Sequence, residues 1–110
     1  MNRRGEVHLH AQPVGLLEES EEGFSFTYEK NYVALGGRPV SASLPTRIEP
    51  YQSKRLFPFF EGMLAEGELR KIQTRLAKLS EEDTFGLLLI SCGSDAPGAV
   101  TILTPLAAPA

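Results

Sequence analysis

The segment Phe24-Ser25-Phe26-Thr27-Tyr28 alternates aromatic side chains with small polar ones. Successive side chains of a β-strand point to opposite faces of the sheet, so a strand here places three aromatic rings on one face. The stretch from Glu18 to Gly23 that precedes it is acidic and ends in glycine, which is typical of a turn. The segment therefore predicts a sheet that buries one face against an aromatic core.

Shorter strands are expected on both sides of this one. Residues 6–10 alternate polar and apolar side chains, Gln12-Pro13 interrupts the alternation, and residues 14–17 resume it. Residues 40–44 carry Val, Ala and Leu at every second position, and Pro45 closes that run. The first half of the chain therefore predicts antiparallel strands joined by short turns.

The second half of the chain changes to helical spacing. Pro58 suits a first helical turn, and apolar pairs four residues apart follow it. Gly62 and Gly67 weaken this stretch, which predicts a short helix, a break near residues 65–67 and then a firmer helix. That helix carries apolar residues at helical spacing, with charges between them, at Leu69, Ile72, Leu76 and Leu79.

A third helix and a last strand follow. Ser80 and Asp83 resemble a capping box, which predicts a helix that runs through Leu88 and ends at Gly93. Residues 100–103 are apolar and partly β-branched, so they predict a strand that returns to the sheet.

The order of elements predicts the fold class. Strands come first, then helices, then one strand, which is typical of an α+β domain. We expect a small, mostly antiparallel sheet, a meander plus a C-terminal return strand, with two or three helices packed on one side. The domain is expected over residues 5–104. Residues 105–110 have no pattern and are expected to be a disordered tail.

Length and charge exclude several classes of protein. The chain has 110 residues, which is too short for a complete kinase, a dinucleotide-binding dehydrogenase or a (β/α)₈ barrel. Its net charge is −3, and the basic residues Lys71, Arg75 and Lys78 share their predicted helix with Glu66 and Glu68. Nucleic acids are bound by clusters of Lys and Arg, so no direct nucleic-acid partner is expected.

The sequence also predicts a cytoplasmic location. Cys92 is the single cysteine, so no intrachain disulfide can form, and a reducing compartment fits. No continuous apolar stretch follows the first residues, so no signal peptide is expected. The longest apolar run, residues 87–90, is too short to cross a bilayer, so no membrane partner is expected.

No arrangement of residues predicts catalysis. His8 and His10 fall on one face of a predicted strand, but a zinc site uses three or four protein ligands and the sequence offers no third. The loop from Gly93 to Gly98 precedes a strand rather than a helix, so it is not a phosphate-binding loop. The sequence predicts a protein that is not an enzyme, with no catalytic residues, no metal and no cofactor.

Residues 57–69 carry more aromatic and acidic side chains than the core of a small domain requires. Phe57-Pro58-Phe59-Phe60 places three aromatic rings in four residues, which a small core can absorb or a partner can cover. Phe60 and Leu64 are expected in the core. The predicted partner-binding residues are Phe59, Met63 and Leu69 as apolar anchors, rimmed by Glu61, Glu66 and Glu68.

Four motifs in order carry a resemblance to a known family. They are Ser41-Ala42-Ser43-Leu44-Pro45, Phe59–Gly67, Phe85–Leu89 and Asp95–Val100. Together they resemble the N-terminal subdomain of HipA-type serine/threonine kinases, and the likeness runs from residue 6 to residue 103. The chain departs from the family pattern where Ala65 replaces a frequent proline, Glu68 a frequent aromatic residue and Ala96 a frequent cysteine.

The resemblance implies a function. The kinase core of that family lies downstream of this subdomain. In three-gene relatives of the HipBA toxin–antitoxin system, a separate protein, HipS, supplies the subdomain and inhibits the kinase toxin HipT. The DNA-binding protein is HipB. The resemblance therefore implies a HipS-type antitoxin that binds a HipT-like serine/threonine kinase, with a HipB-like protein as partner, directly or through the kinase.

Two alternatives to an antitoxin remain open on the sequence. The chain can be a scaffold or dimerisation subunit that bridges the kinase and the DNA-binding protein without blocking catalysis. It can also be the N-terminal fragment of a full-length HipA kinase.

Overall fold

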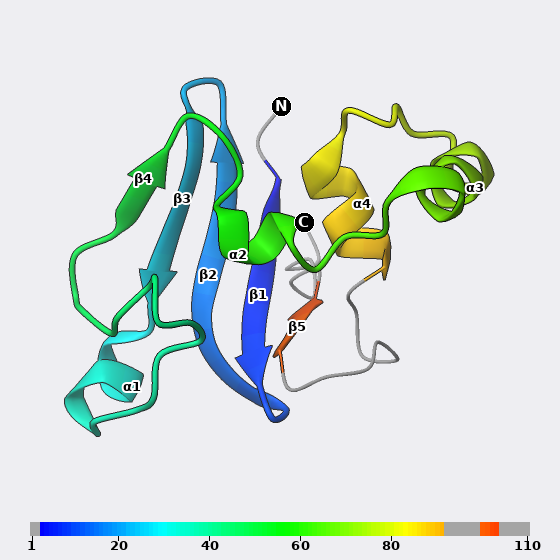
Figure 1. Cartoon of the computed structure of the whole chain (residues 1–110). Coiled ribbons are helices and arrows are strands. Elements are labelled where there is room, and N and C mark those ends of the chain that lie inside the picture. The colour runs from blue at the N-terminus through cyan, green and yellow to red at the C-terminus, as the bar shows by residue number, and fades with distance from the viewer. Residues whose placement is uncertain (1–2, 92–99, 104–110) are drawn as a thin grey trace, which may run out of the picture.

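A computed structural model describes residues 3–91 and 100–103 of the chain. Five strands form one sheet in the order β4-β3-β2-β1-β5, and every neighbouring pair is antiparallel (Figure 1). The return of the last strand to the sheet, beside β1, confirms the α+β prediction. The strands are β1 (Arg4–Leu9), β2 (Gln12–Ser20), β3 (Gly23–Tyr28), β4 (Tyr51–Ser53) and β5 (Val100–Leu103).

In the second half of the chain, the helical region is interrupted where the sequence predicts a break. A short helix, α2, is separated by a turn from the longer α3, and α4 follows. Figure 1 shows α2 and α4 lying against the sheet, whereas α3 projects away from it beyond α4. The helices are α1 (Lys30–Ala34), α2 (Pro58–Glu61), α3 (Gly67–Ala77) and α4 (Thr84–Ser91).

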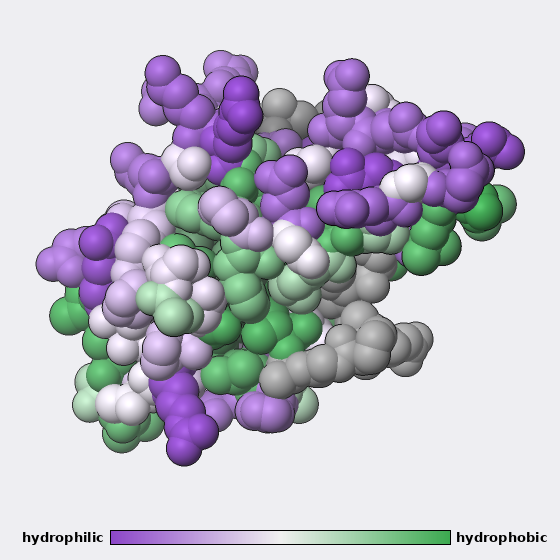
Figure 2. Space-filling model, in the orientation of Figure 1, coloured by the Kyte–Doolittle hydropathy of each residue, from purple (hydrophilic) through white to green (hydrophobic). Residues whose placement is uncertain are grey.

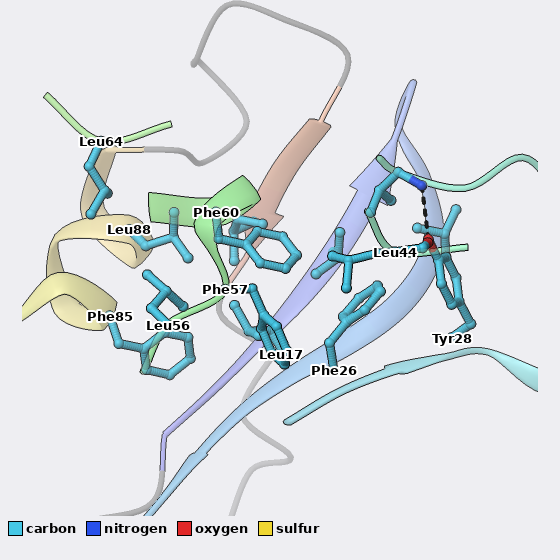
Figure 3. Close-up of a cluster of buried hydrophobic side chains, with 14 of the residues drawn as sticks. Leu17, Phe26, Tyr28, Leu44, Leu56, Phe57, Phe60, Leu64, Phe85 and Leu88 are labelled. Carbon is cyan, nitrogen blue, oxygen red and sulfur yellow. Dashed lines mark hydrogen bonds between the residues drawn. The ribbon is translucent and has the colours of Figure 1, made fainter. Parts of the chain in front are cut away.

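The core lies between the sheet and the helices α2 and α4. Phe26 and Tyr28 of β3 are buried, as the opening segment predicts, and Phe60 of α2 meets the edge of Phe26 at 5.5 Å between ring centroids (Figure 3). Phe85 of α4 meets Phe24 in the same way at 5.9 Å. Edge-to-face pairs of this kind add to the free energy gained by burial alone. The aromatic side chains of β3 therefore hold both helices to the sheet.

The predicted strand over residues 40–44 does not form. Ser41 and Leu44 make one isolated bridge around a tight turn, with the Leu44 N–H donating to the Ser41 carbonyl at 3.0 Å. The hydroxyl of Tyr28 holds this turn: it donates to the Leu44 carbonyl and accepts from the Val40 N–H at 2.9 Å (Figure 3). The strand that pairs with β3 on the side away from β2 is β4, whose three residues are too few to give a periodic signal in the sequence.

The predicted strand over residues 6–10 ends one residue early. His10 lies in the turn after β1, with φ at +51°, while His8 remains in the strand, half-buried beside Glu6. The two imidazoles therefore do not share a strand face. The helix α1, which follows β3 directly, was also not predicted, because its five residues show no helical apolar spacing.

A charged cluster fixes the start of α4. The Asp83 carboxylate accepts from the Gly86 N–H at 3.1 Å, so the helix is capped by Asp83 and not by Ser80 as predicted. Arg3 binds both Asp83 (Nη2–Oδ1, 2.6 Å) and Glu19 of β2 (Nε–Oε1, 2.7 Å). These hydrogen bonds raise the pKa of Arg3, and the Arg3 guanidinium lowers the pKa of Asp83. Arg3 thus ties α4 to the sheet.

Some predictions concern residues outside the described part of the chain. They are the helix end at Gly93, the loop from Gly93 to Gly98, the single Cys92 and the tail of residues 105–110. Within the described residues, no helix has the length and apolar character needed to cross a membrane.

Candidate partner-binding surface

The predicted partner-binding residues surround the connection between α2 and α3, called here the α2–α3 junction (residues 59–69). The chain leaves α2 at Gly62 and enters α3 at Gly67, whose φ of +62° is a conformation that glycine adopts without strain. The Arg70 guanidinium donates to the Ala65 carbonyl at 2.9 Å and so holds the turn. The junction is therefore a defined turn that presents the first residues of α3 to solvent.

The apolar residues predicted at this junction divide between core and surface. Phe60 and Leu64 are buried, which confirms their expected place in the core. Phe59 and Met63 are half-buried and pack against that core, Phe59 with its ring 5.2 Å from that of Phe60. Leu69 is the exposed apolar residue of the predicted set. A partner can therefore cover Leu69 fully and touch only the outer edges of Phe59 and Met63.

The acidic residues predicted to rim the surface all lie in solvent. Glu61 ends α2, Glu66 immediately precedes α3, and Glu68 is in its first turn. Glu68 approaches the Lys71 ammonium at 3.7 Å across one helical turn, a solvent-exposed pair of small energy. Glu66, Glu68 and Leu69 therefore lie together at the start of α3, and Glu61 lies across the turn, at the end of α2.

Of the apolar stripe along α3, the sequence predicts only Leu69 at a surface. The helical spacing is typical of a helix that buries one face, yet Leu69, Ile72 and Leu76 are 55%, 47% and 79% exposed. The buried position of the helix is instead Thr74, whose hydroxyl donates to the Arg70 carbonyl at 2.9 Å. Figure 2 shows apolar surface along the margin of α3, next to its charged side.

The α2–α3 junction is an apolar surface with acidic residues beside it. Among residues 3–91 and 100–103, no group of three His, Cys, Asp or Glu side chains is placed to hold a metal ion. The hollow next to β4, with a volume of about 670 Å³, is lined by residues of β2, β3 and β4 and of the segments beside them, and none of its lining residues belongs to the α2–α3 junction. What the junction offers is apolar surface with a charged border, which suits a protein partner.

Three comparisons place the chain among known proteins. The family model described as the HipA N-terminal domain matches residues 5–103. An uncharacterized protein of Haemophilus influenzae is 37% identical over 100 residues, which cover 91% of each chain. In Sinorhizobium fredii, the protein named "Putative kinase Y4dM" is 33% identical over 106 residues, which cover 88% of this chain and 25% of that protein.

The solved structures give the same answer as the sequences. The structure described as the N-terminal domain of HipA toxin superimposes with a TM-score of 0.71 and 32% identity, over 92% of this chain and 91% of that one. The family model covers nearly the whole chain, and the structural match shares both the fold and a third of the residues. The chain therefore belongs to the HipA N-terminal domain family.

Proposed function

We propose that this domain is an antitoxin of the HipS type, which binds a HipT-like serine/threonine kinase and holds it inactive. In this role the domain is not an enzyme and carries no cofactor. A HipB-like DNA-binding protein joins the complex, directly or through the kinase. The two parts of the proposal, binding and inhibition, rest on different observations.

The observation that carries the proposal is the size of the matched region in different relatives. The matched region makes up 25% of the length of the protein named "Putative kinase Y4dM", but 91% of the Haemophilus influenzae protein. A domain that packs on a kinase within one chain can pack on the same kind of surface from a separate chain. The separate domain loses the high effective concentration that a linker provides, so it needs apolar anchors at its interface.

The α2–α3 junction supplies such an anchor and determines the charge of its partner. Leu69 is exposed at the start of α3, beside Glu66 and Glu68. Glu61 lies across the turn, at the end of α2. The kinase surface is then at least partly basic, because opposite charges speed the encounter while the apolar contact slows dissociation. A domain docked across a kinase core can prevent the closure that phosphoryl transfer requires.

Binding is tested with two variants at the junction and one control. Leu69→Ala and Glu66→Lys are expected to keep the thermal melt of the wild type, to weaken binding to the cognate kinase at least 10-fold, and to lose protection of cells from its toxicity. The matched control is Leu35→Ala, because Leu35 is 84% exposed at the end of α1, away from the junction. Folded junction variants that bind and protect as well as wild type would refute the proposed surface.

Inhibition and absence of catalysis are tested separately. Titration of the isolated domain with Mg-ATP is expected to give no heat of binding, and a micromolar site would contradict the non-enzymatic role. The kinase is expected to lose autophosphorylation when the domain is added in stoichiometric amount. Binding that leaves this activity intact would instead favour a scaffold that bridges the kinase and the DNA-binding protein.

A further inference from the structure

The exposed apolar residues of α3 repeat at the spacing of a helix–helix interface. Leu69, Ile72 and Leu76 are separated by three and then four residues, which places them in one line along the helix. We call this line the α3 seam. Single exposed apolar residues are ordinary on a protein surface, but a line of three at this spacing is the pattern that a second helix covers.

Charges beside the α3 seam are arranged so that the surface complements itself. Glu68 and Arg75 are seven residues apart, so they lie on the same edge of the seam, one near each end of α3. Both are exposed. If the same helix is laid antiparallel on the seam, the acidic end of one copy meets the basic end of the other at both ends of the pair. A parallel arrangement would put these edges on opposite sides of the pair and leave Glu68 and Arg75 without an opposite charge across the seam.

We infer that α3 pairs with α3 of a second copy of this chain, antiparallel about a two-fold axis near Ile72. The seams of the two copies then cover one another, and Glu68 of each copy faces Arg75 of the other. An interface with this symmetry uses the same patch on both copies, which a self-complementary surface satisfies. The inference concerns the chain alone and does not depend on a kinase partner.

The neighbouring helix extends this surface. Ile90 of α4 is 52% exposed, and it lines, with Gln73, Leu76 and Ala77, a shallow hollow of about 290 Å³ at the C-terminal end of α3. In the antiparallel pair this hollow receives apolar side chains from the N-terminal half of the other α3. Two helices of 11 residues make a small interface, so we expect a dissociation constant of the order of tens of micromolar.

Self-association and kinase binding share part of their surface. Glu68 and Leu69 belong both to the α3 seam region and to the α2–α3 junction, whereas Leu76 lies outside the junction. Leu76→Glu is therefore expected to weaken self-association while leaving kinase binding unchanged or tighter. This variant separates the two proposals, because a failure of one leaves the other standing.

The first experiment measures self-association of the full chain by sedimentation equilibrium from micromolar to millimolar concentration. The wild type is expected to pass from monomer to dimer, and Leu76→Glu to weaken the dimer at least 10-fold with an unchanged thermal melt. Leu35→Glu is the matched control, since it places the same charge on an equally exposed leucine of α1. A wild type that stays monomeric throughout overturns the inference, as does equal weakening by both variants.

The second experiment tests the antiparallel charge pairing. Glu68→Lys and Arg75→Glu each place like charges opposite one another in a homodimer, so each variant alone is expected to dimerise several-fold more weakly than wild type. Mixed together, the two variants restore opposite charges at both ends and are expected to form a heterodimer at about wild-type affinity. A mixture that associates no better than the separate variants overturns the antiparallel arrangement.

Discussion

The strand β3 and the helix α3 carry equally regular apolar patterns but differ completely in what covers them. The inward side chains of β3 meet helices of the same chain, and Phe26 and Tyr28 are buried. On α3, the residues of the seam remain in solvent. Periodicity therefore states which side chains share a face, and only the packing of other elements decides whether that face becomes core or surface.

The difference follows from the position of the two elements in the fold. β3 lies between β2 and β4, so its backbone is fixed on both sides and its inner face is under α2. α3 follows a turn that carries it past α4, and Thr74 is its one buried residue. A helix attached along so narrow a line leaves most of its circumference to solvent or to a partner.

The largest effect is expected where the β3 core is opened. Phe60→Ala removes the ring that packs on Phe26, Phe57 and Phe59, and leaves a cavity beneath α2. Because the ring is fully buried, we expect a loss of about 3–5 kcal/mol in the free energy of unfolding, measured by chemical denaturation. A loss below about 1 kcal/mol would show that α2 does not close the core.

A smaller loss in the free energy of unfolding is expected when the Tyr28 hydroxyl is removed from the same core. Tyr28→Phe leaves the Val40 N–H and the Leu44 carbonyl without the hydroxyl that joins them. Two buried backbone groups without a partner should cost about 1–3 kcal/mol in the same measurement. Tyr32→Phe is the matched control, because its hydroxyl donates only to the Arg38 carbonyl at the margin of the fold. Equal losses in the two variants would mean that the turn at residues 40–44 does not depend on Tyr28.

The ion pair between Arg3 and Asp83, which joins α4 to the sheet, is expected to stabilise the fold in a pH-dependent way. The pKa of Asp83 is lower in the folded state because of Arg3, so the pair stabilises the fold above the unfolded pKa of about 3.9. That stabilisation is lost as the pH falls through the folded-state pKa, because the folded carboxylate must then be protonated.

Asp83→Asn isolates this ion pair. The amide oxygen of asparagine still caps α4, but the charge is absent, so we expect a loss of about 1 kcal/mol at pH 7 and a flatter fall in stability below pH 4. Thermal unfolding followed between pH 2 and pH 7 measures both. A variant with the same acid dependence as the wild type would show that other carboxylates control it.

The smallest change in the free energy of unfolding is expected from a substitution on α3. Leu76→Ala removes an apolar side chain of the same class as those in the core, yet the monomer should change by no more than about 0.5 kcal/mol, because the side chain is already in solvent. Chemical denaturation is measured at a low micromolar protein concentration, below the expected dissociation constant of the dimer. The protein is then monomeric, so the loss can be compared directly with that of Phe60→Ala. A loss of more than about 2 kcal/mol would mean that the seam is covered by the chain itself.

The site was predictable to the extent that it depends on local sequence. The glycines at positions 62 and 67 indicate the turn between α2 and α3, and the acidic residues around it are predicted to rim an exposed surface. The division of Phe59, Met63 and Leu69 was not predictable, because it depends on where the core ends. Residues of the same apolar class lie at its rim or beyond it according to the path of the chain.

By itself the sequence determined the class of the fold, the aromatic face of β3, the two-helix break and the family, because each of these follows from neighbouring residues or ordered motifs. Tertiary structure decided three other features: that residues 40–44 form a turn held by Tyr28, that Arg3 joins β2 to α4, and that the α3 seam is exposed. Each of the three depends on groups far apart in the chain, and periodicity cannot report how close such groups come in space.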